Sequence, residues 1–226
     1  DDKVSYTYSE LVKLSSSVGT ALSELIASGD AVGIYMEKCA DAVAAFFATV
    51  YAGGFYSVLN TELPQNRLQT TVSVLNPRVI VTSESLLDTA KEYFPEEKIV
   101  IFEELAKSEP DYNKLAEIRS HKIDTDPLYI NFTSGSTGTP KGIVVCHRSV
   151  IDFIDHFTEI FEIDNNDVIA NQAPFDFDVS VKDIYSVVKT GATLVVVPRR
   201  MFSAPAELID FICDRRVTVM IWAVSA

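Results

Sequence analysis

The stretch "NFTSGSTGTPK", Asn131 to Lys141, is a run of small, hydroxylated and glycine residues. Glycine has no Cβ, so backbone N–H groups beside it stay open to a bound anion. The hydroxyls of the serines and threonines add hydrogen-bond donors, and Lys141 adds a positive charge. This combination is typical of a loop that binds phosphate groups. An ordinary surface turn is the alternative that composition alone leaves open.

The P-loop of nucleoside triphosphatases is another motif with this composition. That motif requires Gly-Lys followed by Ser or Thr, and it leads into a helix. Here Pro140 precedes Lys141, Gly142 follows it, and the run "GIVVC" predicts a strand. The stretch therefore does not fit the P-loop pattern.

Helical and strand patterns alternate on both sides of this stretch. Thr7 and Glu10 predict a capping box at the start of a helix. An apolar stripe at three- and four-residue spacing follows, made of Leu11, Leu14, Val18, Leu22 and Leu25. Further helices are predicted after Asp41, ending at Gly53-Gly54, and from about Arg148, Val179 and Ala206.

Short apolar runs predict buried strands between these helices. They lie at residues 31–36, 78–82, 98–102, 128–132, 142–146, 192–197 and 217–222. The alternation indicates an α/β fold with largely parallel sheets flanked by helices. No linker or low-complexity segment divides the chain, and its last predicted strand reaches the C-terminus. Because domains seldom end on a strand, we expect this chain to be part of a longer protein.

Composition narrows the range of partners. The net charge is −13 with scattered acidic residues, which argues against a nucleic-acid or anionic-membrane surface. The run 42–59 is apolar but contains two glycines, which favours a buried helix and strand over a membrane span. The start of the chain does not resemble a signal peptide. Cys39, Cys146 and Cys213 lie far apart, without metal-ligand spacing, and indicate reduced thiols in a cytoplasmic protein with no metal ligands of its own.

The full string "YINFTSGSTGTPKG", Tyr129 to Gly142, closely resembles the phosphate-binding signature of the adenylate-forming superfamily. Three other segments resemble motifs of that family in the family's order. They are "YTYSEL" (6–11), "YAGGFYSVLNTELPQNRL" (51–68) and "FDFDVSVKDIY" (175–185). The last is similar to a motif of the amino-acid adenylation domains of nonribosomal peptide synthetases. Two departures stand out: the second motif lacks the usual initial Lys, and the family's later motifs have no counterpart before Ala226.

The resemblance implies that residues 1–226 are part of the large N-terminal domain of an adenylate-forming enzyme. It implies a parent enzyme that uses ATP and Mg²⁺ to activate an amino acid as acyl-adenylate, releasing pyrophosphate, before transfer to a carrier-protein phosphopantetheine thiol. The ligands of Mg²⁺ would lie mostly beyond Ala226, and the isolated segment would be inactive. Thr133 and Lys141 would act in catalysis. The phosphates would be held by Thr133, Ser134, Gly135, Ser136, Thr137, Gly138 and Lys141.

The resemblance also implies a substrate site in the "FDFDVSVKDIY" segment. Family spacing selects its second Phe-Asp pair, so Phe177 would border the pocket and Asp178 would meet the substrate's α-ammonium group. Asp178 could instead only cap the helix that it begins. Lys182 would line the side-chain pocket, which would suit an acidic or hydrogen-bonding substrate. Alternatively, Lys182 pairs with Asp178 one helical turn away.

Three other hypotheses complete this set. An acyl- or aryl-CoA ligase is the alternative within the family, but its substrate has no ammonium group for Asp178. A degenerate, non-catalytic fragment that acts in protein interaction is the alternative of another class.

The position of His147 suggests a general base, but a carboxylate substrate is already ionised at neutral pH. We therefore expect His147 to have a structural role at a helix start.

Overall fold

The computed structural model of the chain describes residues 1–133 and 140–222. These residues form two compact units, each described here by itself. Unit 1 contains Asp1–Ser5, Lys38–Ala40 and the chain from Arg148 onward, and unit 2 contains Tyr6–Glu37 and Asp41–His147. The sequence shows no linker at this division, and two of the crossings between the units fall within the helices Ala40–Tyr51 and His147–Ile160.

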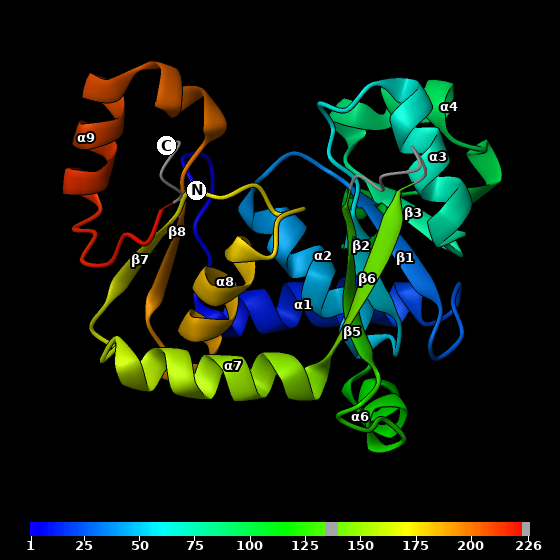
Figure 1. The fold of residues 1–226 in the computed structure, drawn as a ribbon. Helices are drawn as coiled ribbons and strands as arrows, with labels where there is room; N and C mark the ends of the chain where they lie inside the picture. The colour runs from blue at the N-terminus through cyan, green and yellow to red at the C-terminus, as the bar shows by residue number, and fades with distance from the viewer. Residues whose placement is uncertain (134–139, 223–226) are drawn as a thin grey trace. The chain divides into compact units, whose positions relative to one another are not determined.

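Unit 2 is built on a sheet that runs in the order β4-β3-β1-β2-β5-β6 (Figure 1). Its strands are β1 (Ala31–Tyr35), β2 (Phe55–Val58), β3 (Val79–Thr82), β4 (Ile99–Ile101), β5 (Pro127–Thr133) and β6 (Lys141–Cys146). Strands β1 to β5 pair in parallel, and β6 pairs antiparallel with β5 at one edge. The prediction of a largely parallel α/β sheet is therefore confirmed.

Helices precede or connect these strands. They are α1 (Tyr8–Leu22), α2 (Ala40–Tyr51), α3 (Gln65–Leu75), α4 (Leu87–Tyr93), α5 (Phe102–Leu105) and α6 (Tyr112–Ser120), with 3₁₀ turns η1 (Glu84–Leu86) and η2 (Glu96–Lys98). One apolar cluster joins residues of α3 and α4 to β1 and β3 around the buried ring of Tyr35. Phe46 of α2 stacks on Tyr56, which stacks in turn on Tyr129, so α2 reaches the sheet through aromatic contacts.

The capping box at the start of α1 is confirmed. Glu10 N–H donates to the Thr7 hydroxyl, and the Glu10 carboxylate accepts from Thr7 N–H. The prediction that Leu25 belongs to the apolar stripe of this helix is wrong. Helix α1 ends at Leu22, and Leu25 lies beyond it with 39% of its surface exposed. The run 42–59 forms α2 and β2 as expected, and no helix of the described residues is long and apolar enough to cross a membrane.

Unit 1 is built on two parallel strands, β7 (Val168–Asn171) and β8 (Thr193–Val196). The other elements are α7 (His147–Ile160), α8 (Val179–Thr190), η3 (Arg199–Ser203) and α9 (Pro205–Asp214). Val187 of α8 belongs to an apolar cluster with Ile169, whereas Phe211 of α9 belongs to another with the neighbouring Ala170. Because successive strand residues point to opposite faces, α8 and α9 cover opposite faces of this sheet.

The strand predicted at 217–222 is wrong for the described residues. Only Val219 bridges to β7, opposite Ile169. The indole of Trp222 instead donates to the Ala170 carbonyl at 3.0 Å. An apolar run predicts burial, but a strand also needs a partner for each backbone group along it.

Candidate functional site

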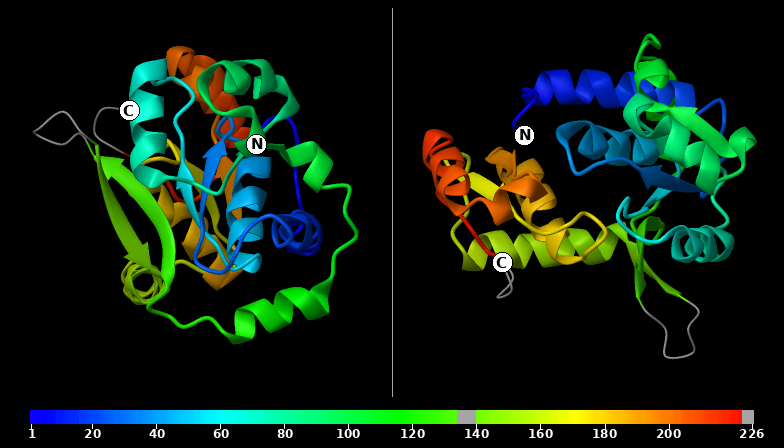
Figure 2. Two further views of the ribbon diagram at one scale, coloured as in Figure 1. Left: turned by 90° about the vertical axis from the view of Figure 1, so that its right-hand side faces the viewer. Right: turned by 90° about the horizontal axis from the view of Figure 1, so that it is seen from above.

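Strands β5 and β6 form the ribbon that carries the glycine-rich stretch at one edge of the sheet (Figure 2). Thr133, the last residue of β5, is the direct cross-strand partner of Lys141, the first residue of β6. Both residues are exposed, so the hydroxyl and the ammonium group are available side by side. The other predicted phosphate-binding residues, Ser134, Gly135, Ser136, Thr137 and Gly138, lie outside the described residues.

The strand after Lys141 agrees with the rejection of the P-loop motif, in which a helix would follow. Gly142 has a packing role that the sequence did not reveal. A Cβ at this position would lie 3.1 Å from Ile130 Cγ2 and 3.3 Å from Phe132 Cε1. Gly142 faces Phe132 across the ribbon, so the absence of a side chain lets the aromatic ring pack against its backbone.

The predicted substrate residues lie at the start of α8, in unit 1. Phe177 is 56% exposed, and Asp178 is exposed at the N-cap position. Within the part of the chain that the structure describes, the Asp178 side chain makes no capping hydrogen bond. Ser180 supports the turn instead, donating from its hydroxyl to the Phe177 carbonyl at 2.7 Å. The interpretation of Asp178 as only a helix cap is therefore wrong.

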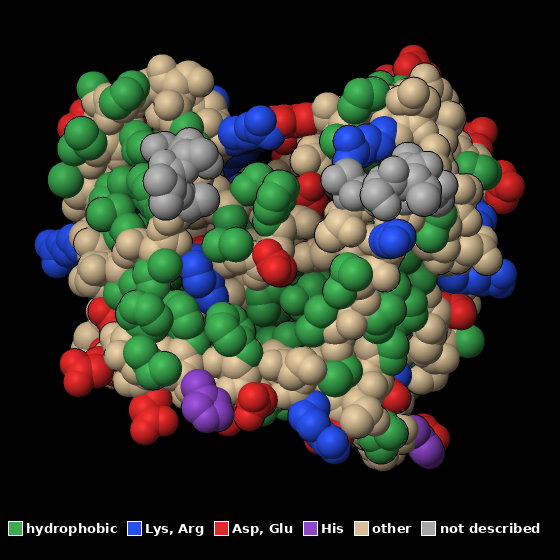
Figure 3. Space-filling view, in the orientation of Figure 1, with side chains coloured by type: hydrophobic (Ala, Val, Ile, Leu, Met, Phe, Trp, Pro, Cys, Tyr) green, Lys and Arg blue, Asp and Glu red, His purple; other side chains and the backbone are tan. Residues whose placement is uncertain are grey.

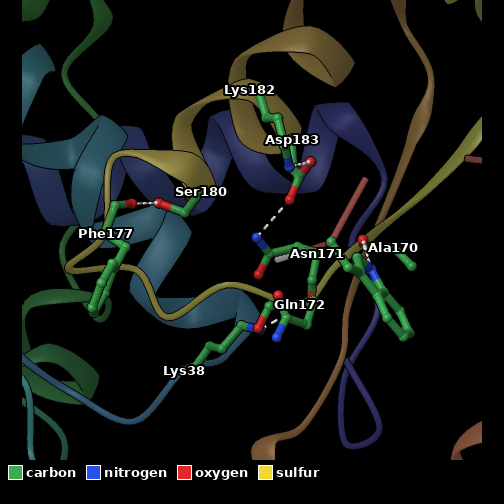
Figure 4. Close-up of polar contacts among 9 residues, drawn as sticks. Lys38, Ala170, Asn171, Gln172, Phe177, Ser180, Lys182 and Asp183 are labelled. Carbon is green, nitrogen blue, oxygen red and sulfur yellow. Dashed lines mark hydrogen bonds and ion pairs between the residues drawn. The ribbon is translucent and has the colours of Figure 1, made fainter. Parts of the chain in front are cut away.

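The sequence left two alternatives open for Lys182. One of them, a pair with Asp178, does not form in the structure. Its Nζ lies 2.6 Å from Asp183 Oδ1, and both side chains are buried. The other carboxylate oxygen, Asp183 Oδ2, accepts from Asn171 Nδ2 at 2.9 Å (Figure 4). Burial raises the pKa of the Asp183 carboxyl, and the contacts with Lys182 and Asn171 oppose that rise.

Lys38 is a second, partly buried lysine close to this group, and sequence reasoning missed it. Its Nζ donates to the carbonyl oxygens of Asn171, Gln172 and Val197 at 2.9, 2.8 and 3.1 Å. Burial lowers the pKa of Lys38 to about 7, although the Asp183 carboxylate acts in the opposite direction. The sequence contains one weak indication of this residue, because Lys38 is a charged residue two positions after the buried strand run 31–36.

His147 is the first residue of α7, in agreement with the helix-start role expected for it. Its backbone N–H donates to the Asp126 carbonyl at 3.2 Å, and burial lowers the pKa of its imidazole. Cys39, Cys146 and Cys213 form no disulfide within the part of the chain that the structure describes. Among the described residues, no three His, Cys, Asp or Glu side chains come together as metal ligands.

The donor chemistry at the ribbon fits a phosphate better than a metal ion. Thr133 and Lys141 offer a hydroxyl and an ammonium group, which are hydrogen-bond donors to anionic oxygens. On the face drawn in Figure 3, Lys and Arg side chains are separated by acidic, apolar and other groups.

The chain resembles short parts of much longer known proteins. Indigoidine synthase of Streptomyces lavendulae is 30% identical over 223 residues, which are 97% of this chain and 17% of that protein. Nonribosomal peptide synthetase 13 of Aspergillus fumigatus is 32% identical over 206 residues, 89% of this chain and 9% of that protein. The chain thus spans a small fraction of the length of these relatives.

The solved structures that the chain resembles include nonribosomal peptide synthetases, as do the relatives found by sequence. The nonribosomal peptide synthetase FmoA3 with α-methyl-L-serine-AMP bound matches with a TM-score of 0.84 and 26% identity, over 95% of this chain and 23% of that one. Its AMPPNP-bound form matches with a TM-score of 0.80 and 26% identity, over 93% of this chain and 22% of that one. The family model described as "AMP-binding enzyme" matches residues 1–225. The chain therefore belongs to the AMP-binding, adenylate-forming enzyme family and is homologous to the adenylation domains of nonribosomal peptide synthetases.

Proposed function

We propose that the parent protein activates an amino acid with ATP. The substrate carboxylate attacks the α-phosphorus of ATP, a P–O bond to the β-phosphate breaks, and the products are an aminoacyl-adenylate and pyrophosphate. The acyl group is then transferred to the phosphopantetheine thiol of a carrier protein, and AMP leaves. In this proposal residues 1–226 are a partial N-terminal subdomain that binds ATP and the substrate, in a cytoplasmic enzyme.

One observation carries the choice of an amino acid as substrate. Asp178 is exposed at the N-terminus of α8, and within the described chain its carboxylate is not used to cap that helix. An α-ammonium group that leaves water loses hydration, and a carboxylate at hydrogen-bonding distance compensates for most of that loss. Phe177, which is also exposed, supplies an apolar wall beside it.

The phosphate end of the reaction is assigned to the β5–β6 ribbon. Thr133 and Lys141 are cross-strand partners, so their side chains lie next to each other at the end of the ribbon. Lys141 would stabilise negative charge that builds on the departing pyrophosphate, and the hydroxyls and backbone N–H groups of the stretch would position it. When bound, Mg²⁺ would supply charge neutralisation at the phosphate oxygens.

The relatives support this chemistry. FmoA3 was solved with an aminoacyl-adenylate, α-methyl-L-serine-AMP, and with AMPPNP. The alternative of an acyl- or aryl-CoA ligase leaves Asp178 without an ammonium group to bind. A degenerate interaction module would be expected to have lost residues of the glycine-rich stretch, whereas the stretch is intact in this sequence.

Exchange of labelled pyrophosphate into ATP by the full-length enzyme tests the proposal. Each candidate amino acid is compared with its des-amino analogue in the wild type, in Asp178→Ala and in a control, Asp210→Ala, which changes an exposed carboxylate on α9. We expect Asp178→Ala to lower kcat/KM for the preferred amino acid about a hundredfold and to leave the analogue nearly unchanged. Equal weakening of both substrate classes, or a wild type that prefers the des-amino acid, would support the CoA-ligase alternative instead.

A further inference from the structure

The Lys38 ammonium group has a main-chain acceptor for each of its donors. An ammonium group has three N–H donors, and Lys38 directs them at three main-chain carbonyls, those of Asn171, Gln172 and Val197. Figure 4 shows the side chain reaching toward the backbone of Asn171 and Gln172. Lys38 lies 133 residues before Asn171, so this contact is a product of the tertiary fold alone.

The three carbonyls lie where the two parallel strands of unit 1 end. Asn171 is the last residue of β7, Val197 directly follows β8, and Asn171 is paired in register with Val196. Lys38 therefore ties together the carboxyl ends of neighbouring strands. In open parallel α/β sheets, ligands bind beyond those ends.

The segment that leaves β7 at this point carries the predicted substrate residues. Residues 172–178 connect β7 to α8 and include Phe177 and Asp178. The start of the segment is held by Lys38, whose Nζ also lies 5.8 Å from the centre of the Phe175 ring. Its end is held by the Ser180 hydroxyl, which donates to the Phe177 carbonyl. The two contacts therefore lie at either end of the segment that leads to Asp178.

Charged groups around Lys38 come mainly from α8. Asp183 attracts the Lys38 ammonium group and accepts from Asn171, while Lys182 pairs with Asp183. Strands β7 and β8 carry no charged side chain, and the Asp1 carboxylate accepts from Ala40 N–H in the segment that follows Lys38. An ammonium group removed from water is unfavourable unless its donors are satisfied, so the three carbonyl contacts account for a lysine at this position.

We propose that Lys38 is a positioning residue for the substrate: by holding the start of segment 172–178 against the strand ends, it places Asp178 to receive the α-ammonium group. The inference rests on the proposed function, because it needs the role assigned there to Asp178. Lys38 itself contacts backbone carbonyls, and its effect on substrate binding passes through segment 172–178.

A double-mutant cycle tests this role in the full-length enzyme. Lys38→Met, Asp178→Ala and the double variant are compared by pyrophosphate exchange with the preferred amino acid. We expect Lys38→Met to lower kcat/KM by about tenfold or more, mainly through the KM for the amino acid, with the KM for ATP within about twofold of the wild type. In the Asp178→Ala background the same substitution should change kcat/KM by less than about threefold, because the residue that Lys38 positions is already absent.

Two variants separate positioning from general loss of folding. Lys38→Arg keeps a positive charge with several donors and should recover most of the activity that Lys38→Met loses. Lys189→Met removes an exposed lysine of α8 that pairs with Asp155, and its activity should stay close to that of the wild type. Should Lys38→Met fail to fold, Lys38→Gln takes its place in the cycle, since the amide keeps two donors.

The outcomes distinguish this inference from the proposed function. Additive losses in the cycle, or equal effects on the KM values of ATP and amino acid, would overturn the role of Lys38 while leaving amino-acid activation intact. A wild-type enzyme that exchanges pyrophosphate with no amino acid would overturn both. Non-additive losses with rescue by Lys38→Arg would support both.

Discussion

Lys182 and Asp183 are consecutive residues of α8, and their side chains form a buried ion pair with 2.6 Å between Nζ and Oδ1. Consecutive residues on a helix do not normally face each other, whereas residues four apart do. Asp178, four residues before Lys182, remains exposed. Lys182 pairs with Asp183 because both side chains are buried, and a buried ammonium group is unfavourable without a nearby counter-charge. The Asp178 carboxylate is exposed to water and has less need of such a partner.

This pair predicts coupled stability effects. Lys182→Met strands a buried carboxylate, and Asp183→Asn strands a buried ammonium group, so each should lower the free energy of unfolding by about 3–5 kcal/mol. The double variant should lose clearly less than the sum, as measured by urea unfolding. Lys189→Met, which breaks an exposed pair, serves as the control and should change stability by less than about 1 kcal/mol. Additive losses would show that the two charges do not depend on each other.

The position of Lys141 predicts a large effect on catalysis. In the full-length enzyme, Lys141→Ala should slow ATP–pyrophosphate exchange by more than about tenfold, because in the proposed function the substitution removes a charge that stabilises the phosphates in a preorganised site. Lys107→Ala, which changes an exposed lysine of the same unit, should leave the exchange rate nearly unchanged. Exchange by Lys141→Ala at close to the wild-type rate would contradict the phosphate assignment.

The isolated segment should not catalyse the reaction. Residues 1–226 contain the glycine-rich stretch and Asp178, but the resemblance assigns the ribose contact, the magnesium ligand and a catalytic lysine to later motifs. We expect no pyrophosphate exchange with any amino acid under conditions in which the full-length enzyme is active. Substantial turnover by the segment alone would mean that the active site is complete without those motifs.

The capping box of α1 predicts a measurable pKa change. Hydrogen bonds from the Thr7 backbone and hydroxyl lower the pKa of the Glu10 carboxyl. A lowered folded-state pKa means that this contribution to stability is present above the unfolded-state pKa and is lost as pH falls through the folded-state value. NMR titration should find the pKa of Glu10 below its ordinary value in the wild type and closer to that value in Thr7→Ala. An unchanged pKa in the variant would show that the Thr7 hydroxyl does not bond to the Glu10 carboxylate in solution.

Local chemistry made much of the fold predictable from the sequence. The Thr7 and Glu10 capping box and the helix from Val179 are formed by contacts between near neighbours. The apolar runs that became β1, β3 and β4 could be identified because buried parallel strands are continuously apolar. The glycine-rich stretch could also be identified from local sequence, since its composition and order carry the resemblance to the family to which the chain belongs.

Other features depend on residues that are distant in the sequence. The run 217–222 has the composition of a strand, but only Val219 meets a strand partner among the described residues. Short β7 was missed because its four residues end in a polar Asn171, which is buried through its contact with Asp183. In both cases, backbone and side-chain partners supplied by the fold decided the structure.

The sequence by itself predicted the type of chemistry, because the hydrogen-bond donors, glycines and Lys141 that would suit a phosphate are neighbours in one stretch. It also determined that Asp178 begins a helix, because the periodicity that follows is local. Only the tertiary structure decided which charges are used within the fold and which stay exposed. Lys182 is neutralised by Asp183, and Lys38 is satisfied by carbonyls 133 or more residues away. The physical reason is that burial makes an unpaired charge unfavourable, and which residues are buried together is set by the packing of distant segments.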